Sequence, residues 1–461
     1  MGATEEFARF VHNTELEDMP KEAVSKAKEM FIDTIGTALA GTSQISGKIA
    51  TKYTREMGGT PEATVLGEGF RTWAPMAAFT NALLAHNQDF DDYLPAGSEE
   101  DNFPKNAGHA SCALVPTVLA LGEKLGLSGK AVLAAYILGI EVYNRIAHNC
   151  HDIRLRGWSG THTYGVIGAA AAAAKLLKLD VHQTIMAFGI AASASSGIFV
   201  NVHNMTNTFH AGNAARGGIE AALLAKEGFL SHDAIIESPR GFGDSFLGKG
   251  GCNYEKMTQN LGNPYHIVHP GLGIKQYPCA FPVFYAADGV LELRKEYSFT
   301  FEDVEQVTLW VSQYQYERYV IPEPKYGYGG RFSLNFACAA GILDGELVME
   351  TFTDAKLKEP KFKVALGKIK ILVDEARAGE TLLYFAPMVI KLKDGRELRK
   401  RIEIPKGHPK NPLTRDELLG KFRRNAKIVL PQEQIAKAGK LIEHLEELKD
   451  IGELMSVLTT K

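Results

Sequence analysis

The 461-residue sequence has few cysteines and no excess of charge of either sign, and each absence excludes classes of protein. Its cysteines are scattered and form no C-x-x-C pair, which argues against a disulfide framework or a zinc knuckle. The 51 basic and 54 acidic side chains give a net charge of −3, whereas nucleic-acid-binding proteins usually carry a basic stripe. We therefore expect no nucleic-acid partner and five reduced thiols: Cys112, Cys150, Cys252, Cys279 and Cys338.

Long apolar runs are also missing. The closest candidate, residues 186–202, is rich in small residues, which is typical of a tightly packed buried helix rather than a membrane span. The N-terminal residues MGATEEFARFVHN have neither the basic start nor the apolar run of a signal peptide. Together with the expected reduced thiols, these features predict a cytoplasmic protein that does not contact a membrane.

Common cofactor and metal motifs are absent. No G-x-G-x-x-G follows an expected strand, no Walker A motif occurs, and there is no H-E-x-x-H or G-x-S-x-G. The fourteen histidines are not clearly paired with carboxylates at ligand spacing. We accordingly expect neither a cofactor nor a metal ion.

The hydrophobic pattern predicts a mainly α fold with a change of texture near residue 268. Helical spacing dominates before that point, as in residues 128–148 after a candidate cap at Ser128. The segment 165–178 is an alanine run that favours a buried helix. We expect one large all-helical domain formed by residues 1–267 and 405–461.

The remaining segment, residues 268–404, is expected to form a smaller, inserted α+β lid domain. Residues 307–312 and 369–373 alternate apolar and polar side chains as strands do. Asp394-Gly395 between two alternating runs predicts a two-residue hairpin turn. Helical spacing returns after residue 405, where Thr414 and Glu417 fit a capping box.

The segment 86–116 is the one in which we expect chemistry. Asp89, Asp91 and Asp92 crowd together, and a loop rich in proline and glycine then leads to His109. Ser111 follows as a candidate helix cap. A carboxylate near an imidazole is a natural acid–base pair because each shifts the pKa of the other. The alternative is that these aspartates only cap helices and hold loops.

Five ordered stretches make the sequence similar to the MmgE/PrpD family. They are DFDD with a following loop, H-x-S and an apolar helix; GWSGTHTYGVIGAAAAAAKLLKLD; FHAGNAARGGIEAALLAKEGF; GIKQYPCAFPVFYAADGVLEL; and FSLNFACAAGILDG. The resemblance implies a large all-α domain with a smaller α+β lid, a homodimer, and a small di- or tricarboxylate substrate. It also implies four catalytic residues: Asp89, His109, Lys275 and, through the stretch VTLWVSQYQY, Tyr316.

Four positions depart from the family pattern. Tyr93 replaces a threonine, Ser159 and Ala280 each replace a histidine, and Asn207 replaces a lysine. His162, three residues after Ser159, and His210, three residues after Asn207, are candidates to compensate for the missing histidine and lysine. His210 is also a candidate helix cap. The resemblance therefore yields these substrate-binding candidates: Tyr93, Ser159, His162, Asn207 and His210.

The function that the resemblance implies is a lyase that removes a proton next to a carboxylate and expels water from a small hydroxy-polycarboxylate, as 2-methylcitrate dehydratase does. Lys275 would hold the substrate carboxylate, and His109 would act as base or acid. Asp89 would orient His109 or act as the base, and Tyr316 would donate a proton or position the substrate. Because fixed cations stabilise the charge, the scheme requires no metal.

Two alternatives stay open. The missing imidazoles leave fewer acids for a leaving group, which favours an epimerase or isomerase of a dicarboxylate, such as iminodisuccinate epimerase. The substitutions also permit a non-catalytic homologue that binds a ligand, although the retained Asp89 and His109 speak against it.

Overall fold

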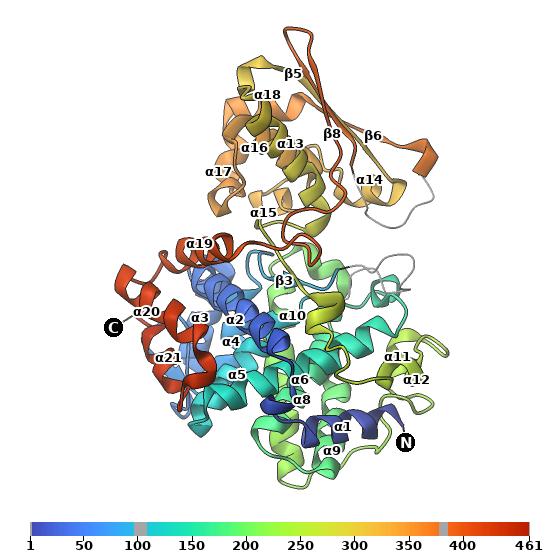
Figure 1. Ribbon diagram of the computed structural model, residues 1–461, viewed down its shortest axis with the longest axis vertical. Coiled ribbons are helices and arrows are strands. Elements are labelled where there is room, and N and C mark those ends of the chain that lie inside the picture. The colour runs from blue at the N-terminus through green and yellow to red at the C-terminus, as the bar shows by residue number, and fades with distance from the viewer. Residues whose placement is uncertain (1, 96–107, 378–385, 461) are drawn as a thin grey trace. The chain divides into compact units, whose positions relative to one another are not determined.

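The computed structural model of the chain divides into two compact units (Figure 1). It describes residues 2–95, 108–377 and 386–460. Unit 1 comprises Met1–Asn87, Asp91–Ile274 and Thr414–Lys461. Unit 2 comprises Gln88–Phe90 and Lys275–Leu413. The chain thus leaves unit 1 twice and returns each time.

Unit 1 is built from helices. They are α1 (Ala3–Asn13), α2 (Lys21–Gly41), α3 (Ile45–Met57), α4 (Ala74–Ala85), α5 (Ser111–Leu125), α6 (Gly129–His148), α7 (Gly160–Thr163), α8 (Gly165–Leu176), α9 (Val181–Ala194), α10 (Thr206–Lys226), α11 (Phe242–Leu247), α12 (Tyr254–Thr258), α19 (Arg415–Ala426), α20 (Gln432–Glu443) and α21 (Gly452–Val457). In Figure 1 the C-terminal α19 and α20, in red, lie beside α2, in blue. The expected mainly α fold class is confirmed, whereas the lid role of the second unit stays a prediction.

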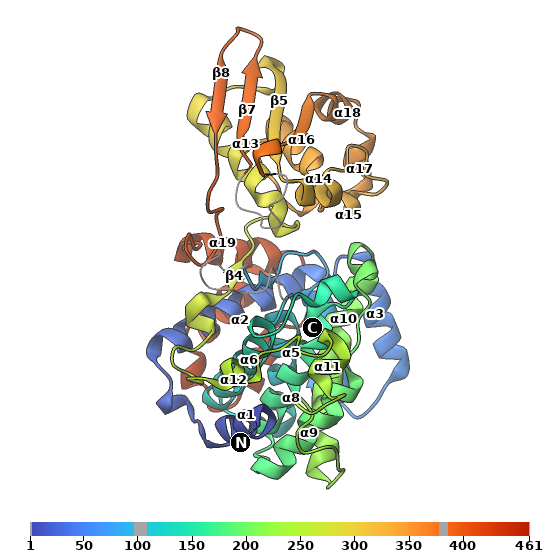
Figure 2. The ribbon, with the colours of Figure 1, turned by 90° about the vertical axis from the view of Figure 1, so that its right-hand side faces the viewer.

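The core of unit 1 depends on close packing of helices rich in small residues. Helix α8 carries the predicted alanine run, which is buried, and α8 lies beside α5 and α6 (Figure 2). A Cβ atom added at Gly139 of α6 would lie 2.8 Å from the carbonyl oxygen of Gly168 in α8. Similarly, a Cβ at Gly218 of α10 would lie 2.4 Å from the Ala169 side chain. Glycine at these positions lets the helix backbones approach closely.

Local capping signals agree with the prediction at two helix starts. The Ser128 hydroxyl accepts a hydrogen bond from the backbone N–H of Ala131 at the start of α6. At the start of α19, Thr414 and Glu417 form the expected capping box. Such signals are readable because donor and acceptor lie within one turn of each other.

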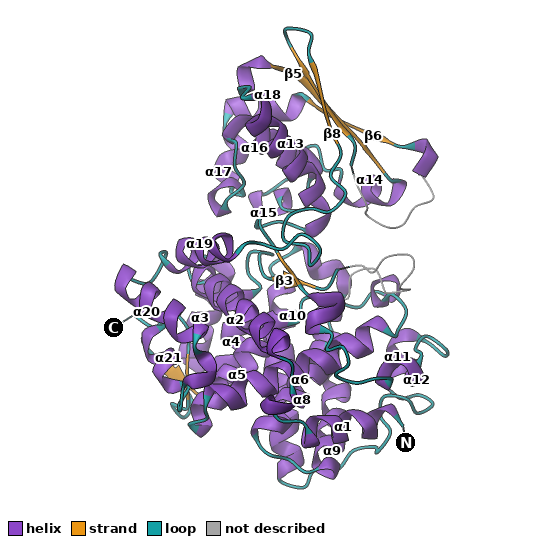
Figure 3. Ribbon diagram, viewed as in Figure 1, coloured by secondary structure: helices purple, strands orange, loops and turns teal. Residues whose placement is uncertain are grey.

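Unit 2 combines helices with a four-stranded sheet, drawn in orange in Figure 3. The strand order is β6-β5-β7-β8, with β5 parallel to β6 and antiparallel to β7. The expected hairpin turn joins β7 to β8, with Gly395 at φ 91°. The strands are β5 (Val304–Val311), β6 (Ile369–Val373), β7 (Met388–Leu392) and β8 (Glu397–Lys400). The helices are α13 (Phe284–Tyr297), α14 (Gln313–Tyr319), α15 (Gly327–Gly330), α16 (Leu334–Asp344), α17 (Asp354–Lys358) and α18 (Pro360–Gly367).

Two short sheets lie in unit 1, and the second positions the site. Strands β1 (Ala63–Thr64) and β2 (Arg71–Thr72) pair with each other, as do β3 (Asp92–Tyr93) and β4 (Gly273–Ile274). In the second pair, Asp92 lies opposite Ile274 and Tyr93 opposite Gly273. The ring of Tyr93 needs this glycine, because an added Cβ would lie 2.2 Å from its Cζ atom.

The expectation of five reduced thiols is wrong for two of them. Cys150 and Cys252 form a disulfide, and the three other cysteines are buried thiols outside any disulfide. Backbone pairing brings the two sulfurs together, since the His151 N–H donates to the Gly251 carbonyl oxygen at 2.7 Å. The cysteines lie 102 residues apart in sequence, so no local motif predicts their pairing.

Helix α19 is attached to α2 by a buried ion pair. The Lys421 Nζ atom lies 2.5 Å from Asp33 Oδ1, and both side chains are almost fully buried. Burial raises the pKa of Asp33 to about 6 even though Lys421 opposes the shift, and the charges of Asp91 and Asp92 raise it further. Among the described residues, no helix is both long and apolar enough to cross a membrane.

The disulfide predicts the number of reactive thiols. Protein denatured without a reductant is expected to expose three thiols to a chromogenic thiol reagent, because two of the five sulfurs are bonded to each other. Denaturation after reduction is expected to expose all five. Five reactive thiols without reductant would contradict the pairing.

Replacing Lys421 by methionine is expected to destabilise the fold by about 3–5 kcal/mol, because it leaves the Asp33 carboxylate buried without its cation. The pKa of Asp33 is already raised in the folded protein, so ionising this group opposes folding as the pH rises through about 6. The stability difference between Lys421→Met and wild type is therefore expected to be larger at pH 8 than at pH 5 in urea titrations. The exposed Lys437→Met is the control, and an equal loss at both pH values would contradict the assignment.

Candidate active site

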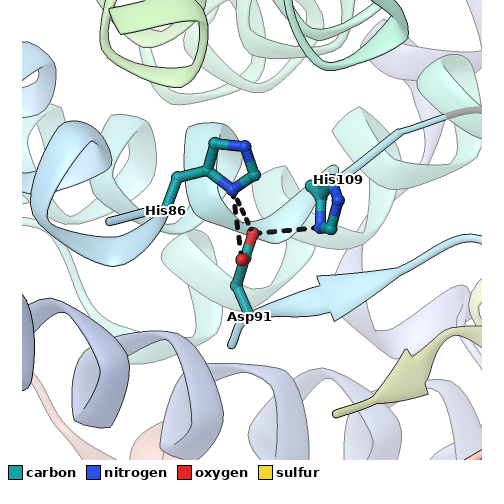
Figure 4. A group of neighbouring side chains, drawn as sticks. All are labelled: His86, Asp91 and His109. Carbon is teal, nitrogen blue, oxygen red and sulfur yellow. Dashed lines mark hydrogen bonds and ion pairs between the residues drawn. The ribbon is translucent and has the colours of Figure 1, made fainter. Parts of the chain in front are cut away.

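A buried carboxylate lies between two imidazoles in unit 1 (Figure 4). His86 Nδ1 lies 2.9 and 3.1 Å from the two carboxylate oxygens of Asp91. His109 Nδ1 lies 3.3 Å from Asp91 Oδ2, and the two ring centroids are 4.6 Å apart. Both imidazoles thus direct the same nitrogen toward one negative charge.

The local chain path explains how these three residues meet. His86 is the C-cap residue of α4, and its backbone N–H donates to the Ala82 carbonyl oxygen at 3.1 Å. Asp89 then adopts φ 50°, a left-handed conformation that aspartate tolerates better than most residues. The chain reverses and delivers Asp91 to the start of β3.

His109 is held in place from two further sides. Its backbone N–H donates to the Thr161 hydroxyl at 3.2 Å, and its Nδ1 lies 2.5 Å from the backbone carbonyl oxygen of Asp92. Gly108 allows this approach, because it has φ 102° and an added Cβ would lie 2.6 Å from the Thr161 nitrogen. With two acceptors facing Nδ1, that nitrogen carries a proton, and Nε2 is the nitrogen that can gain or lose one.

Asp92, rather than Ser111, caps helix α5. The Ser111 N–H and hydroxyl both donate to the Asp92 carboxylate, at 3.2 and 2.9 Å. The Ser111 oxygen also lies 2.7 Å from the Tyr136 hydroxyl. The prediction that Ser111 caps the helix is therefore wrong, because Ser111 is the first residue of α5. A carboxylate at a helix N-terminus is favoured by the helix dipole.

The two neighbouring carboxylates have opposite pKa shifts. Burial raises the pKa of Asp92 to about 6, and the charge of Asp91 adds to the shift. Burial also opposes ionisation of Asp91, but the charges and hydrogen bonds of His86 and His109 outweigh it and hold its pKa well below the ordinary value. Asp91 is therefore the permanent negative charge beside His109.

The same three side chains have the composition of a metal site. The ligand atoms of His86, Asp91 and His109 lie within 4.8 Å of one another, and they are the one such group among the described residues. Direct hydrogen bonds between the imidazole nitrogens and the carboxylate already account for these distances. We therefore assign them as a hydrogen-bonded trio, here called the Asp91 trio.

Lys275 and Asp89 form a buried pair in unit 2. The Lys275 Nζ atom lies 2.5 Å from Asp89 Oδ1 and 2.9 Å from its carbonyl oxygen. Asp89 was expected to orient His109 or to act as the base, and the carboxylate that lies against His109 Nδ1 is that of Asp91.

Sequence reasoning missed a buried cation in unit 2. The Arg331 guanidinium is almost fully buried, which lowers its pKa, while the charge of Asp89 acts in the opposite direction. Arg331 directly precedes the FSLNF stretch, and that position was the only available signal. Tyr316, by contrast, lies on α14 with 39% of its surface exposed.

The substrate-binding candidates on α7 and α10 lie near one another in unit 1. A Cβ atom added at Gly197 would lie within 3.6 Å of Ser159, His162 and His210. His162 Nδ1 bonds the Ser196 hydroxyl at 2.9 Å, and Asn207 is buried at the start of α10.

His210 does not cap α10. The capping position is Met205, and among the described residues His210 Nδ1 has no hydrogen-bond partner although it is buried. Burial lowers the pKa of His162 to about 3 and that of His210 to about 4. Both side chains are therefore neutral hydrogen-bonding groups near pH 7.

Neither His162 nor His210 is expected to become protonated between pH 8 and pH 5. Their ring nitrogens are to be followed by nitrogen NMR, with assignments from His162→Asn and His210→Asn and with free histidine as reference. Histidine in the unfolded chain has a pKa of about 6.5, so each buried ring opposes folding as the pH falls below that value. A ring that titrates together with free histidine would contradict its burial.

Comparison with known proteins gives the chain a family. The model of the MmgE/PrpD N-terminal domain matches residues 5–255, and that of the MmgE/PrpD C-terminal domain matches residues 277–447. Cis-aconitate decarboxylases of Mus musculus and Homo sapiens are each 28% identical to this chain, over 99% of it and over 93% and 94% of their own lengths. That of Aspergillus terreus is 25% identical, over 99% of this chain and 96% of its own. The chain belongs to the MmgE/PrpD family.

Proposed function

We propose that this protein is a lyase of small polycarboxylates, and that its reaction is the loss of water from a hydroxy acid after removal of a proton next to a carboxylate. The observation that carries the proposal is the Asp91 trio. It leaves His109 with a proton on Nδ1 and makes Nε2 the nitrogen that exchanges a proton with the substrate. An imidazole held in this way by a carboxylate is an effective general base and acid.

The proposed roles of Lys275 and Arg331 follow from their charge. Removing a proton next to a carboxylate builds enediolate-like negative charge, which a fixed cation stabilises. Lys275 is buried and offers an ammonium that Asp89 already orients. Arg331 adds a planar guanidinium suited to bidentate recognition of a carboxylate. Tyr316 is proposed to donate a proton or to position the substrate, and its exposure on α14 is compatible with either role.

The chemistry of α7 and α10 supports a hydroxy acid as substrate. His162 and His210 are neutral, and Ser159 and Asn207 stand where the resemblance expects a histidine and a lysine. Neutral donors and acceptors are suited to hydrogen-bonding a hydroxyl group. A tricarboxylate, in contrast, is bound more strongly by permanent cations. Tyr93 contributes a further phenol at β3.

Decarboxylation is the second candidate because relatives named cis-aconitate decarboxylase align over nearly the whole chain. The two reactions use His109 in opposite senses. In dehydration Nε2 first accepts a proton from carbon, and the hydroxyl group then takes a proton, from Nε2 or from Tyr316, and leaves as water. In decarboxylation a carbon–carbon bond breaks, carbon dioxide leaves, and a protonated Nε2 returns a proton to carbon. The homodimer and the cytoplasmic location remain predictions.

Proton NMR in deuterated buffer is the test of this function. The purified protein is to be incubated with 2-methylcitrate, citrate, cis-aconitate, malate and iminodisuccinate. Loss of an α-proton signal is the expected result, with a new vinyl signal where the hydroxy acid is citrate or malate, and with collapse of the methyl doublet to a singlet where it is 2-methylcitrate. A dicarboxylate product from cis-aconitate, with release of carbon dioxide, would favour decarboxylation, and deuterium incorporation with inversion would favour an epimerase. No change across the panel would contradict all three reactions on these substrates.

Two substitutions test the assigned roles. His109→Ala is expected to lower kcat by about 10²- to 10⁴-fold with little change in KM, because it removes the proton-transfer group. Lys275→Met is expected to lower kcat/KM through both parameters, because the cation contacts the substrate before and during the reaction. His182→Ala, an exposed histidine on α9, is the control. Full activity of His109→Ala would leave the proposed mechanism without its base.

A further inference from the structure

We propose that His86 is a positioning residue that holds the Asp91 carboxylate, in its ionised form, against the imidazole of His109. The proposal concerns unit 1 alone, and it rests on the proposed function only for its activity readout. It assigns to His86 a role in the reaction without contact with the substrate. The residue was not among the candidates from the sequence.

The geometry of the Asp91 trio carries the first step of the argument. His86 Nδ1 faces both carboxylate oxygens, at 2.9 and 3.1 Å, whereas His109 Nδ1 faces only Oδ2, at 3.3 Å. Two contacts from one donor fix the plane of the carboxylate, and one contact from the other does not. The orientation of Asp91 is therefore set by His86, and His109 meets a carboxylate that is already aligned.

The surroundings of Asp91 explain why it needs a second imidazole. The charges of Asp91 and Asp92 raise the pKa of Asp33, and the charge of Asp91 raises the pKa of Asp92. The Lys421 ammonium lies against Asp33 rather than against Asp91. Burial opposes the ionised form of Asp91, but the charges and hydrogen bonds of His86 and His109 outweigh it, so both imidazoles together keep Asp91 ionised.

A packing role alone does not account for His86. Its side chain is fully buried, and among the described residues its Nε2 has no hydrogen-bond partner. An unpaired buried nitrogen costs about 1–3 kcal/mol, which an apolar side chain of similar volume would avoid. The imidazole is useful at this position because of its other nitrogen, the one that donates to Asp91.

Three groups around His109 have separate roles. The backbone carbonyl oxygen of Asp92, 2.5 Å from Nδ1, selects the tautomer. The charge of Asp91 stabilises the imidazolium that forms when Nε2 accepts a proton, as in other carboxylate–histidine pairs. His86 keeps that charge in place, so its removal is expected to weaken proton transfer without weakening substrate binding.

Two replacements of His86 distinguish the effect of its N–H donor from the effect of its side-chain volume. His86→Asn keeps an N–H group near the position of Nδ1, and His86→Leu keeps the volume without a donor. Asp91→Asn removes the charge itself. We expect Asp91→Asn and His86→Leu to lower kcat by about 10- to 10³-fold with KM nearly unchanged, and His86→Asn to stay within about threefold of wild type.

The pH profile gives a readout that a structural role would not change. Loss of the Asp91 charge, or of its alignment, is expected to move the limb of the kcat/KM profile that reports His109 to lower pH by about one unit. His86→Asn is expected to leave that limb in place. The matched control is His148→Leu, which removes another buried histidine, one that faces His266 Nδ1 at 3.1 Å, and which is expected to lower Tm without moving the limb.

Ring titration by NMR tests the inference even if no substrate of the panel is turned over. The ¹³Cε1 signal of His109, assigned with His109→Ala, is expected to titrate at lower pH in Asp91→Asn and His86→Leu than in wild type and His86→Asn. Equal titration in all four proteins would overturn the proposal. Equal damage by His86→Asn and His86→Leu would also overturn it, since His86 would then act by shape.

A metal assignment is the remaining outcome to distinguish. Wild-type protein dialysed against a chelator is expected to keep its activity and its NMR titration. Loss of activity that Zn²⁺ restores, together with broadening of the His109 ring signal on addition of Mn²⁺, would overturn the proposal and make the Asp91 trio a set of metal ligands. If His86→Leu does not fold, His86→Asn and Asp91→Asn decide between the outcomes.

Discussion

The ionised carboxylate of Asp91, buried in the helical unit, is the constraint on which the site depends. A buried charge is tolerated only where donors surround it, and here the donors are two imidazoles from different parts of the chain. One comes from the end of α4 and the other from the residues just before α5. The turn after α4, the short β3–β4 pair and the close approach at Gly108 are the local features that bring them together.

Three buried carboxylates lie in the same region, and the difference between their pKa values has a chemical consequence. Asp33, Asp91 and Asp92 are buried close to one another, with Lys421 paired to Asp33. The pKa of Asp92 is raised to about 6, so a proton is more easily kept there than on Asp91. The arrangement thus separates a carboxylate that stays charged beside His109 from one that caps a helix.

Local patterns in the sequence predicted much of the fold, and long-range contacts account for what they missed. The mainly α class, the Asp394-Gly395 turn and the Thr414 capping box depend on residues within a few positions of one another. The sequence also drew attention to the aspartates before the loop and to His109. It could not tell which aspartate meets His109, because alternate residues of one short segment point in different directions. The partner of Cys150 and the burial of Arg331 depend on distant segments and carried no local signal.

The balance of charge bears on the substrate more directly than the family does. Lys275 is already paired with Asp89, so a substrate carboxylate that binds this ammonium shares it with another anion. Arg331 is a second buried cation of unit 2, but its pKa is lowered by burial, which shows that its charge is poorly solvated. On α7 and α10 the imidazoles are neutral and the residues beside them are serine and asparagine. Within unit 1, neutral groups of this kind can hydrogen-bond a hydroxyl group without the cation that a further carboxylate would need, which supports the proposal of a hydroxy acid as substrate.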